Sequence, residues 1–154
     1  MRRKSGVVAA ASSTPWNTAM SVRHLLVAYV STAVVFLLLD AIWLGTMADR
    51  LYRPTIGHLM REPFAVAPAA LFYLLYVAGI VIFAVSPALH TGRWSTALGF
   101  GALLGLFAYA TYTLTNQATL KDWTWTLAIA DLCWGTFVTA IAAAAAARIA
   151  LALR

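Results

Sequence analysis

Four stretches of the chain are almost continuously apolar, and the polar residues gather between them. These stretches cover residues 24–45, 65–85, 96–116 and 126–147. A helix needs about 20 predominantly apolar residues to cross the hydrocarbon layer of a bilayer, and each stretch is long enough. The pattern therefore predicts four transmembrane helices.

The links between these stretches are short, covering residues 46–64, 86–95 and 117–125. Short links place sequential helices side by side and antiparallel. Small residues, which let helix backbones approach closely in lipid, occur at Gly101 and Gly105 and in the alanine run 142–147. We predict an all-α, four-helix up-and-down bundle in the membrane, built by residues 21–154 as one domain.

Composition excludes a water-soluble fold. The chain has 154 residues, of which 62% are hydrophobic and 10% charged. Soluble domains are on average about 45–50% apolar and about 25% charged, so this chain lacks the polar surface that a protein needs in water. Its net charge of +6 suits cations that flank membrane spans, so we expect no nucleic-acid partner. A single cysteine and three scattered histidines indicate no disulfide and no metal site, and we expect no cofactor.

The N-terminus and the distribution of cations bear on topology. Residues 1–20 begin with basic residues, but their apolar run is too short for a signal peptide. Met20 directly precedes the first apolar stretch, so we interpret residues 1–20 as a disordered extension, or as lying before the true start. Lysine and arginine are more frequent on the side of the termini, which favours both termini in the cytoplasm of a bacterial inner membrane; a start at Met20 removes that excess.

Two acidic residues, Asp40 and Asp131, lie inside apolar stretches. An Asp at the centre of a membrane helix costs roughly 2.5–3.5 kcal/mol on insertion scales, and such residues usually face the bundle interior and mark a functional site. Both lie five residues from the same membrane face, which at 1.5 Å per residue is roughly 7–8 Å. Each is followed three residues later by a tryptophan on the same helix face, Trp43 or Trp134.

The other two stretches carry polar aromatic residues at this level. Tyr109, Tyr112, Thr113 and Asn116 follow the spacing of one helix face, and Tyr73 and Tyr76 are three apart. We therefore predict a pocket near one membrane face, lined by Asp40, Trp43, Tyr73, Tyr76, Tyr109, Tyr112, Asn116, Asp131 and Trp134.

Three interpretations of this polar half stay open. The buried acids could bond to neighbouring helices and only hold the bundle in register. They could line a ligand or catalytic pocket in which the two carboxyls divide the roles of acid and base. They could form the carrier site for a cation or proton, although transporter sites usually lie nearer the bilayer midplane.

The first link has its own chemistry. Arg50, Arg53 and Arg61 alternate there with apolar residues. Such a segment is a candidate for contact with lipid phosphates at the membrane interface, and it is equally well explained as a solvated loop whose arginines set topology.

Four segments resemble a known family of small bacterial membrane proteins, domain of unknown function 2177. They are residues 39–45 (LDAIWLG), 71–79 (LFYLLYVAG), 109–121 (YATYTLTNQATLK) and 131–135 (DLCWG). The resemblance implies a start near Met20 and an Asp at the position of Thr113. If that Asp were an obligatory acid, this chain would lack its chemistry.

The resemblance implies no activity, because the family has no assigned function. We hypothesise that the protein binds or processes a lipid-like or small amphipathic ligand, and whether it is an enzyme stays open. The alternatives are a cation- or proton-coupled transporter acting as a dimer, and a structural subunit of a larger membrane complex with no site of its own. Membrane lipid is the expected partner.

Overall fold

The computed structural model describes residues 22–153, so the interpretation of residues 1–20 and of a start at Met20 lies outside the described part. Those described residues form helices and no strand. In chain order the elements are α1 (Val22–Met47), η2 (Ala48–Tyr52), α2 (Arg53–Ile56), η3 (Gly57–Leu59), α3 (Val66–Ile80), η4 (Val81–Val85), α4 (Ser86–Thr91), α5 (Trp94–Thr119) and α6 (Trp125–Ala152).

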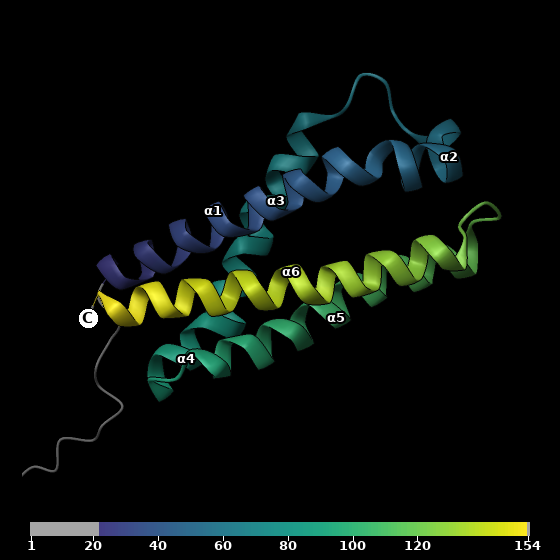
Figure 1. Ribbon diagram of the computed structural model, residues 1–154. Coiled ribbons are helices and arrows are strands. Elements are labelled where there is room, and N and C mark those ends of the chain that lie inside the picture. Colours follow the sequence, from purple (N-terminus) through teal and green to yellow (C-terminus); the bar gives the residue numbers. More distant parts are fainter. Residues whose placement is uncertain (1–21, 154) are drawn as a thin grey trace, which may run out of the picture.

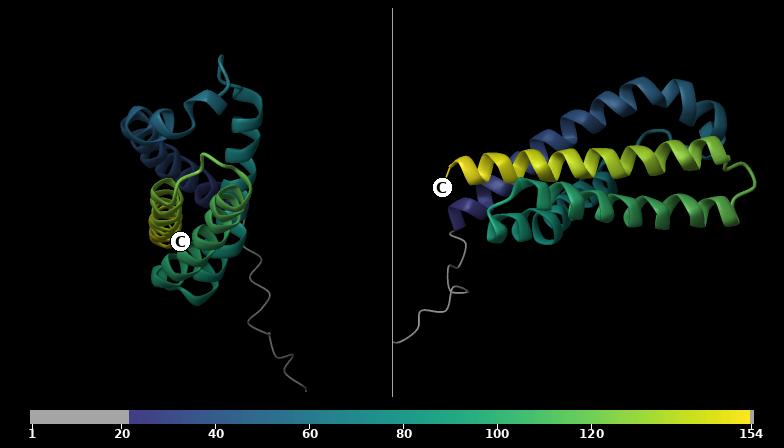
Figure 2. Two further views of the ribbon diagram at one scale, coloured as in Figure 1. Left: turned by 90° about the vertical axis from the view of Figure 1, so that its right-hand side faces the viewer. Right: turned by 60° about the horizontal axis from the view of Figure 1, so that its bottom comes forward.

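Four helical stretches are long and apolar enough to cross a membrane, which confirms the predicted all-α membrane fold. They cover Val22–Leu59, Val66–Thr91, Trp94–Thr119 and Trp125–Ala152. Helices α1, α5 and α6 run alongside one another, and α6 lies between the other two (Figure 1). The second stretch, formed by α3, η4 and α4, crosses these helices obliquely (Figure 2).

The second apolar stretch continues as a helix through much of the predicted link 86–95. The π-helical turn η4 leads directly into α4, and Pro87 lies in the first turn of α4. Proline is tolerated in a first helical turn, so Pro87 does not end the helix. The helix ends at Gly92, whose φ of 68° is left-handed and favours glycine.

Small residues allow the close approach of α5 and α6, as the sequence predicted. A Cβ atom added to Gly101 would lie 2.9 Å from the Ala143 Cβ, and one added to Gly105 would lie 2.9 Å from the Thr139 side chain. Real Cβ atoms essentially never come so close. The apolar core lies beside this contact, around the fully buried side chains of Phe36, Ile80, Leu89 and Val138.

The first helix does not end at residue 45. It continues through η2, α2 and η3 to Leu59, so most of the predicted link 46–64 is helical. We call residues 48–59 the covering segment. Leu51, Tyr52 and Ile56 of this segment pack against Trp123, Leu127 and Ala128 at the start of α6, which places the segment over that end of the bundle (Figure 1).

Candidate functional site

Both intramembrane acids are buried at the same end of the bundle. Asp40 is 7% exposed and Asp131 is 3% exposed. Asp40 lies seven residues before the end of α1 and Asp131 six residues after the start of α6. At 1.5 Å per residue, each is about 10 Å from the helix end nearest the covering segment.

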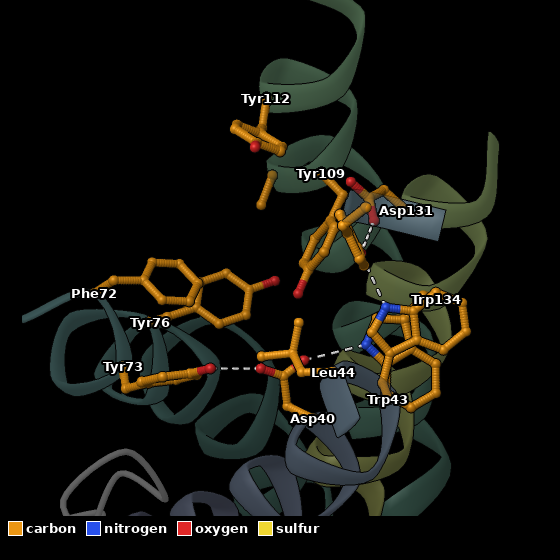
Figure 3. Close-up of a pocket in the computed structure, with 12 residues that line it drawn as sticks. Asp40, Trp43, Leu44, Phe72, Tyr73, Tyr76, Tyr109, Tyr112, Asp131 and Trp134 are labelled. Atoms are coloured by element: carbon orange, nitrogen blue, oxygen red, sulfur yellow. Dashed lines mark hydrogen bonds between the residues drawn. The ribbon is translucent and has the colours of Figure 1, made fainter. Parts of the chain in front are cut away.

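A pocket of about 420 Å³ lies between the helices at this level and contains both carboxyl groups (Figure 3). Its walls come from α1, η2, α3, α5 and α6. The lining residues are Asp40, Trp43, Leu44, Tyr52, Phe72, Tyr73, Tyr76, Ala108, Tyr109, Tyr112, Asp131 and Trp134. Apart from the two acids, these side chains are aromatic or aliphatic.

Some of the residues that line the pocket are also exposed at the surface of the bundle. Its most exposed lining residues are Leu44 on α1, Phe72 on α3 and Tyr112 on α5, which are 43%, 46% and 52% exposed. The outer surfaces of membrane-spanning helices contact lipid. These three residues therefore mark the side on which the pocket reaches the surface of the bundle.

Asp40 accepts hydrogen bonds on both carboxylate oxygens. The Trp134 indole Nε1 donates to Oδ1 at 3.2 Å, and the Tyr73 hydroxyl donates to Oδ2 at 2.6 Å. These donors come from α6 and α3, so the Asp40 carboxylate joins three helices (Figure 3).

Asp131 accepts a hydrogen bond from Tyr52 of the covering segment, and Tyr52 in turn accepts one from Trp43 of α1. The Trp43 indole Nε1 donates to the Tyr52 hydroxyl oxygen at 3.0 Å, and the Tyr52 hydroxyl donates to Asp131 Oδ1. An indole N–H can only donate, so Tyr52 accepts from Trp43 and directs its own hydrogen to Asp131.

Each tryptophan of the two Asp-x-x-Trp pairs therefore serves the Asp of the other helix and not the Asp of its own pair. Trp43 of α1 acts on Asp131 of α6 through Tyr52, and Trp134 of α6 acts directly on Asp40 of α1. The two indole rings stack, with centroids 4.5 Å apart and planes 6° from parallel. This exchange fixes α1 against α6 at the depth of the pocket (Figure 3).

Three polar groups of the lining are left available. Among residues 22–153, the Tyr109 hydroxyl, the Tyr112 hydroxyl and Asp131 Oδ2 have no hydrogen-bond partner, whereas the Tyr76 hydroxyl bonds to Thr139 Oγ1 at 2.9 Å. Figure 3 shows the Tyr109 hydroxyl pointing toward the centre of the pocket. The pocket can therefore offer a ligand two hydroxyls and one carboxylate oxygen.

Eight of the nine predicted pocket residues line this cavity, and Asn116 does not. Asn116 lies one helical turn beyond Tyr112, closer to the end of α5, and is not among the lining residues. The lining also contains residues absent from the prediction, namely Leu44, Tyr52, Phe72 and Ala108.

The three predicted lipid-phosphate residues lie outside the pocket. Arg50, Arg53 and Arg61 are exposed, and Arg53 pairs with Asp49 at 3.1 Å on the covering segment. Their interaction with lipid phosphate stays a prediction. No group of three or more His, Cys, Asp and Glu residues that could hold a metal ion occurs within residues 22–153.

Thr113, where the family resemblance implies an Asp, is fully buried behind the pocket wall. Its hydroxyl accepts a hydrogen bond of 3.2 Å from the indole of Trp123, which is 4% exposed. A carboxylate at this position could accept the same bond. Thr113 is not among the lining residues, so the departure at this position leaves the composition of the pocket wall unchanged.

Thr113→Val is expected to lower the free energy of unfolding by about 1–3 kcal/mol, because it leaves the buried Trp123 indole N–H without an acceptor. The change is nearly isosteric. The midpoint of unfolding in dodecyl sulfate, followed by circular dichroism, measures the effect. The matched control is Thr111→Val on the exposed face of α5, expected within about 0.5 kcal/mol of the wild type. Equal midpoints for the two variants would contradict this role of the hydroxyl.

Comparison with known proteins connects the chain to one family. A protein-family model described as "Predicted membrane protein (DUF2177)" matches residues 25–148. Comparison with curated proteins and with solved structures finds no match.

Proposed function

The chain belongs to the DUF2177 family of predicted membrane proteins, and from that premise and the pocket we propose that it binds a lipid-like or small amphipathic ligand. The family description states no activity, so the proposal depends on the site. The observation that carries it is the cavity of about 420 Å³ around two buried carboxyl groups.

The size and lining of the cavity suit such a ligand. Ligand pockets usually measure about 300–1,000 Å³ and combine mostly apolar walls with a few polar groups that fix orientation. Here aromatic and aliphatic side chains form the walls, and the polar groups converge at the Asp40 and Asp131 end. An amphipathic molecule can bury its polar part there and keep its apolar part against Leu44 and Phe72.

The side opening supports entry from the bilayer. An amphiphile already dissolved in lipid can reach the pocket by lateral diffusion, past residues that face lipid. The carboxyl groups are about 10 Å from the helix ends, close to the depth at which lipid headgroups and acyl chains meet. With the termini in the cytoplasm, as the cation distribution favours, this would be the outer leaflet of a bacterial inner membrane.

Binding accounts for the molecule better than the alternatives. Residues that only hold helices in register need no cavity beside them. A transporter needs a path to both membrane faces, but the other half of the described bundle is filled by Phe36, Ile80, Leu89 and Val138, all fully buried. A structural subunit would not need two buried carboxyl groups facing an open pocket.

Filling the cavity tests the proposal. Ala108→Trp places an indole inside the pocket, whereas Phe107→Trp places the same side chain on the neighbouring position, which is 65% exposed. We expect the wild type and Phe107→Trp to retain a bound amphiphile after purification, detected by mass spectrometry of the intact complex. Ala108→Trp is expected to lose at least about tenfold in occupancy, since 1.4 kcal/mol of lost packing is sufficient. Equal occupancy in all three proteins would refute the pocket as the binding site.

A further inference from the structure

The pocket contains acidic groups without a basic partner. Asp40 and Asp131 are both more than nine-tenths buried, and no Lys, Arg or His of residues 22–153 lines the cavity with them. Buried charges in proteins are normally paired or coordinated to a metal. When the two carboxyls are ionised, an occupant of the pocket with a positive charge would supply the missing counter-charge.

The hydrogen bonds within the site do not supply that counter-charge. The donors to the two carboxylates are indole and phenol groups, which are neutral. They orient the carboxylates, and they leave Asp131 Oδ2 without a hydrogen-bond partner among the described residues. The site is thus preorganised to receive a positive group.

The remaining walls suit an organic cation. Tyr73, Tyr76, Tyr109 and Tyr112 line the pocket together with Phe72. The faces of aromatic rings attract cations, and cages of such rings are the usual means by which proteins recognise quaternary ammonium groups. Carboxylates within an aromatic cage combine both attractions.

A metal ion fits the same space poorly. Calcium takes six to eight oxygen ligands in a tight shell of about 2.3–2.6 Å. The cavity of about 420 Å³ is far larger than such a shell, and no acidic third ligand accompanies the two Asp residues in the described part of the chain.

We propose that the ligand of this pocket is a cationic amphiphile. Its ammonium group lies between Asp40 and Asp131, among the four tyrosines that line the pocket. This inference rests on the proposed binding function and adds the charge of the ligand. The ammonium can belong to a free alkylammonium compound or to the amine headgroup of a membrane lipid.

The test uses the full chain in nanodiscs of digalactosyldiacylglycerol, a neutral lipid without an amine. Tritiated dodecyltrimethylammonium is bound and measured by scintillation proximity, and unlabelled amphiphiles with the same chain length compete. Dodecyltrimethylammonium is expected to displace the label, whereas dodecyl maltoside and dodecyl sulfate are not. Displacement by dodecylphosphocholine as well would point to a lipid headgroup, and its failure to displace would point to a free cation.

Charge-neutral variants locate the cation. Asp131→Asn and Asp40→Asn are each expected to weaken binding at least about tenfold, a loss of 1.4 kcal/mol. The matched control is Asp122→Asn, which removes an acid at the same end of the bundle that is 61% exposed and paired with His58. The affinity of this control is expected to equal that of the wild type. If a pocket variant fails to fold, the competition series on the wild type still decides the question.

Two failures are distinguishable. If dodecyl maltoside or dodecyl sulfate displaces the label as well as the cation does, or if the folded Asn variants bind like the wild type, the ammonium inference is overturned and the binding function stands. If no amphiphile of any charge binds to the wild type, the proposed function itself fails.

Discussion

Gly135→Ala is expected to collapse the pocket and to lower the free energy of unfolding by about 1–3 kcal/mol or more, as overpacking of a filled contact does. A Cβ atom at this position would lie 2.0 Å from Tyr109 Cγ and 2.1 and 2.3 Å from its two Cδ atoms, so it would overlap the part of the ring nearest the backbone. The Tyr109 ring also packs edge-on against Tyr76, with centroids 6.4 Å apart. Because the Tyr109 ring lines the cavity, a shift of the ring away from α6 would change the shape of the cavity, so amphiphile binding should fall together with stability.

Gly99→Ala is the matched control for this change. An added Cβ at Gly99 has no atom within 4 Å, and the residue lies inside α5, five residues after its start, where alanine is the better helix former. Its unfolding midpoint in dodecyl sulfate is expected to equal or exceed that of the wild type. If Gly135→Ala unfolds at the same point as Gly99→Ala, the Tyr109 ring does not pack tightly against Gly135 of α6.

The membrane fold could be predicted because it depends on two strong rules. Twenty apolar residues are needed to cross a bilayer, and small residues are needed where two membrane helices touch. The four apolar stretches satisfy the first rule. Gly101 and Gly105 satisfy the second, and the structure places both against α6. Lengths and contacts of this kind are properties of local sequence.

The depth of the two acidic residues in the membrane could also be predicted from the sequence. Counting residues from the ends of the apolar stretches placed Asp40 and Asp131 at one level, and the structure brings both to one cavity. The exchange of tryptophans between the two helices was not accessible, because the partner of an indole depends on how two helices cross. Asn116 shows the same limit, since helical periodicity gave its face but not the point along α5 at which the pocket ends.

Tyr52 could not be identified from periodicity. It lies nine residues after Trp43, and at about 100° per residue a regular α-helix would put it on the opposite face. The π-helical turn at Ala48–Tyr52 changes this phase and brings the Tyr52 hydroxyl to the Trp43 indole. No residue type in that turn indicates a π-helix, so the contact between Trp43 and Tyr52 could not be predicted from the sequence.

Tyr52→Phe is expected to produce the second large effect, because one lost oxygen leaves two groups of the site without their partner. The Trp43 indole loses its acceptor and Asp131 Oδ1 loses its donor. Each such loss costs about 1–3 kcal/mol in a buried site. Tyr52 also joins the covering segment to α6, so amide hydrogen exchange in residues 48–59 should accelerate in addition to the fall in the unfolding midpoint.

Tyr112→Phe separates this effect from a general response to losing a phenol. Tyr112 lines the same pocket and is 52% exposed, and its hydroxyl has no hydrogen-bond partner among residues 22–153. Its exchange rates and midpoint are therefore expected to match those of the wild type. If Tyr52→Phe leaves residues 48–59 as protected as Tyr112→Phe does, the apolar contacts of Leu51 and Ile56 alone hold the covering segment. The Trp43–Tyr52–Asp131 connection would then orient the Asp131 carboxylate without fixing the segment above it.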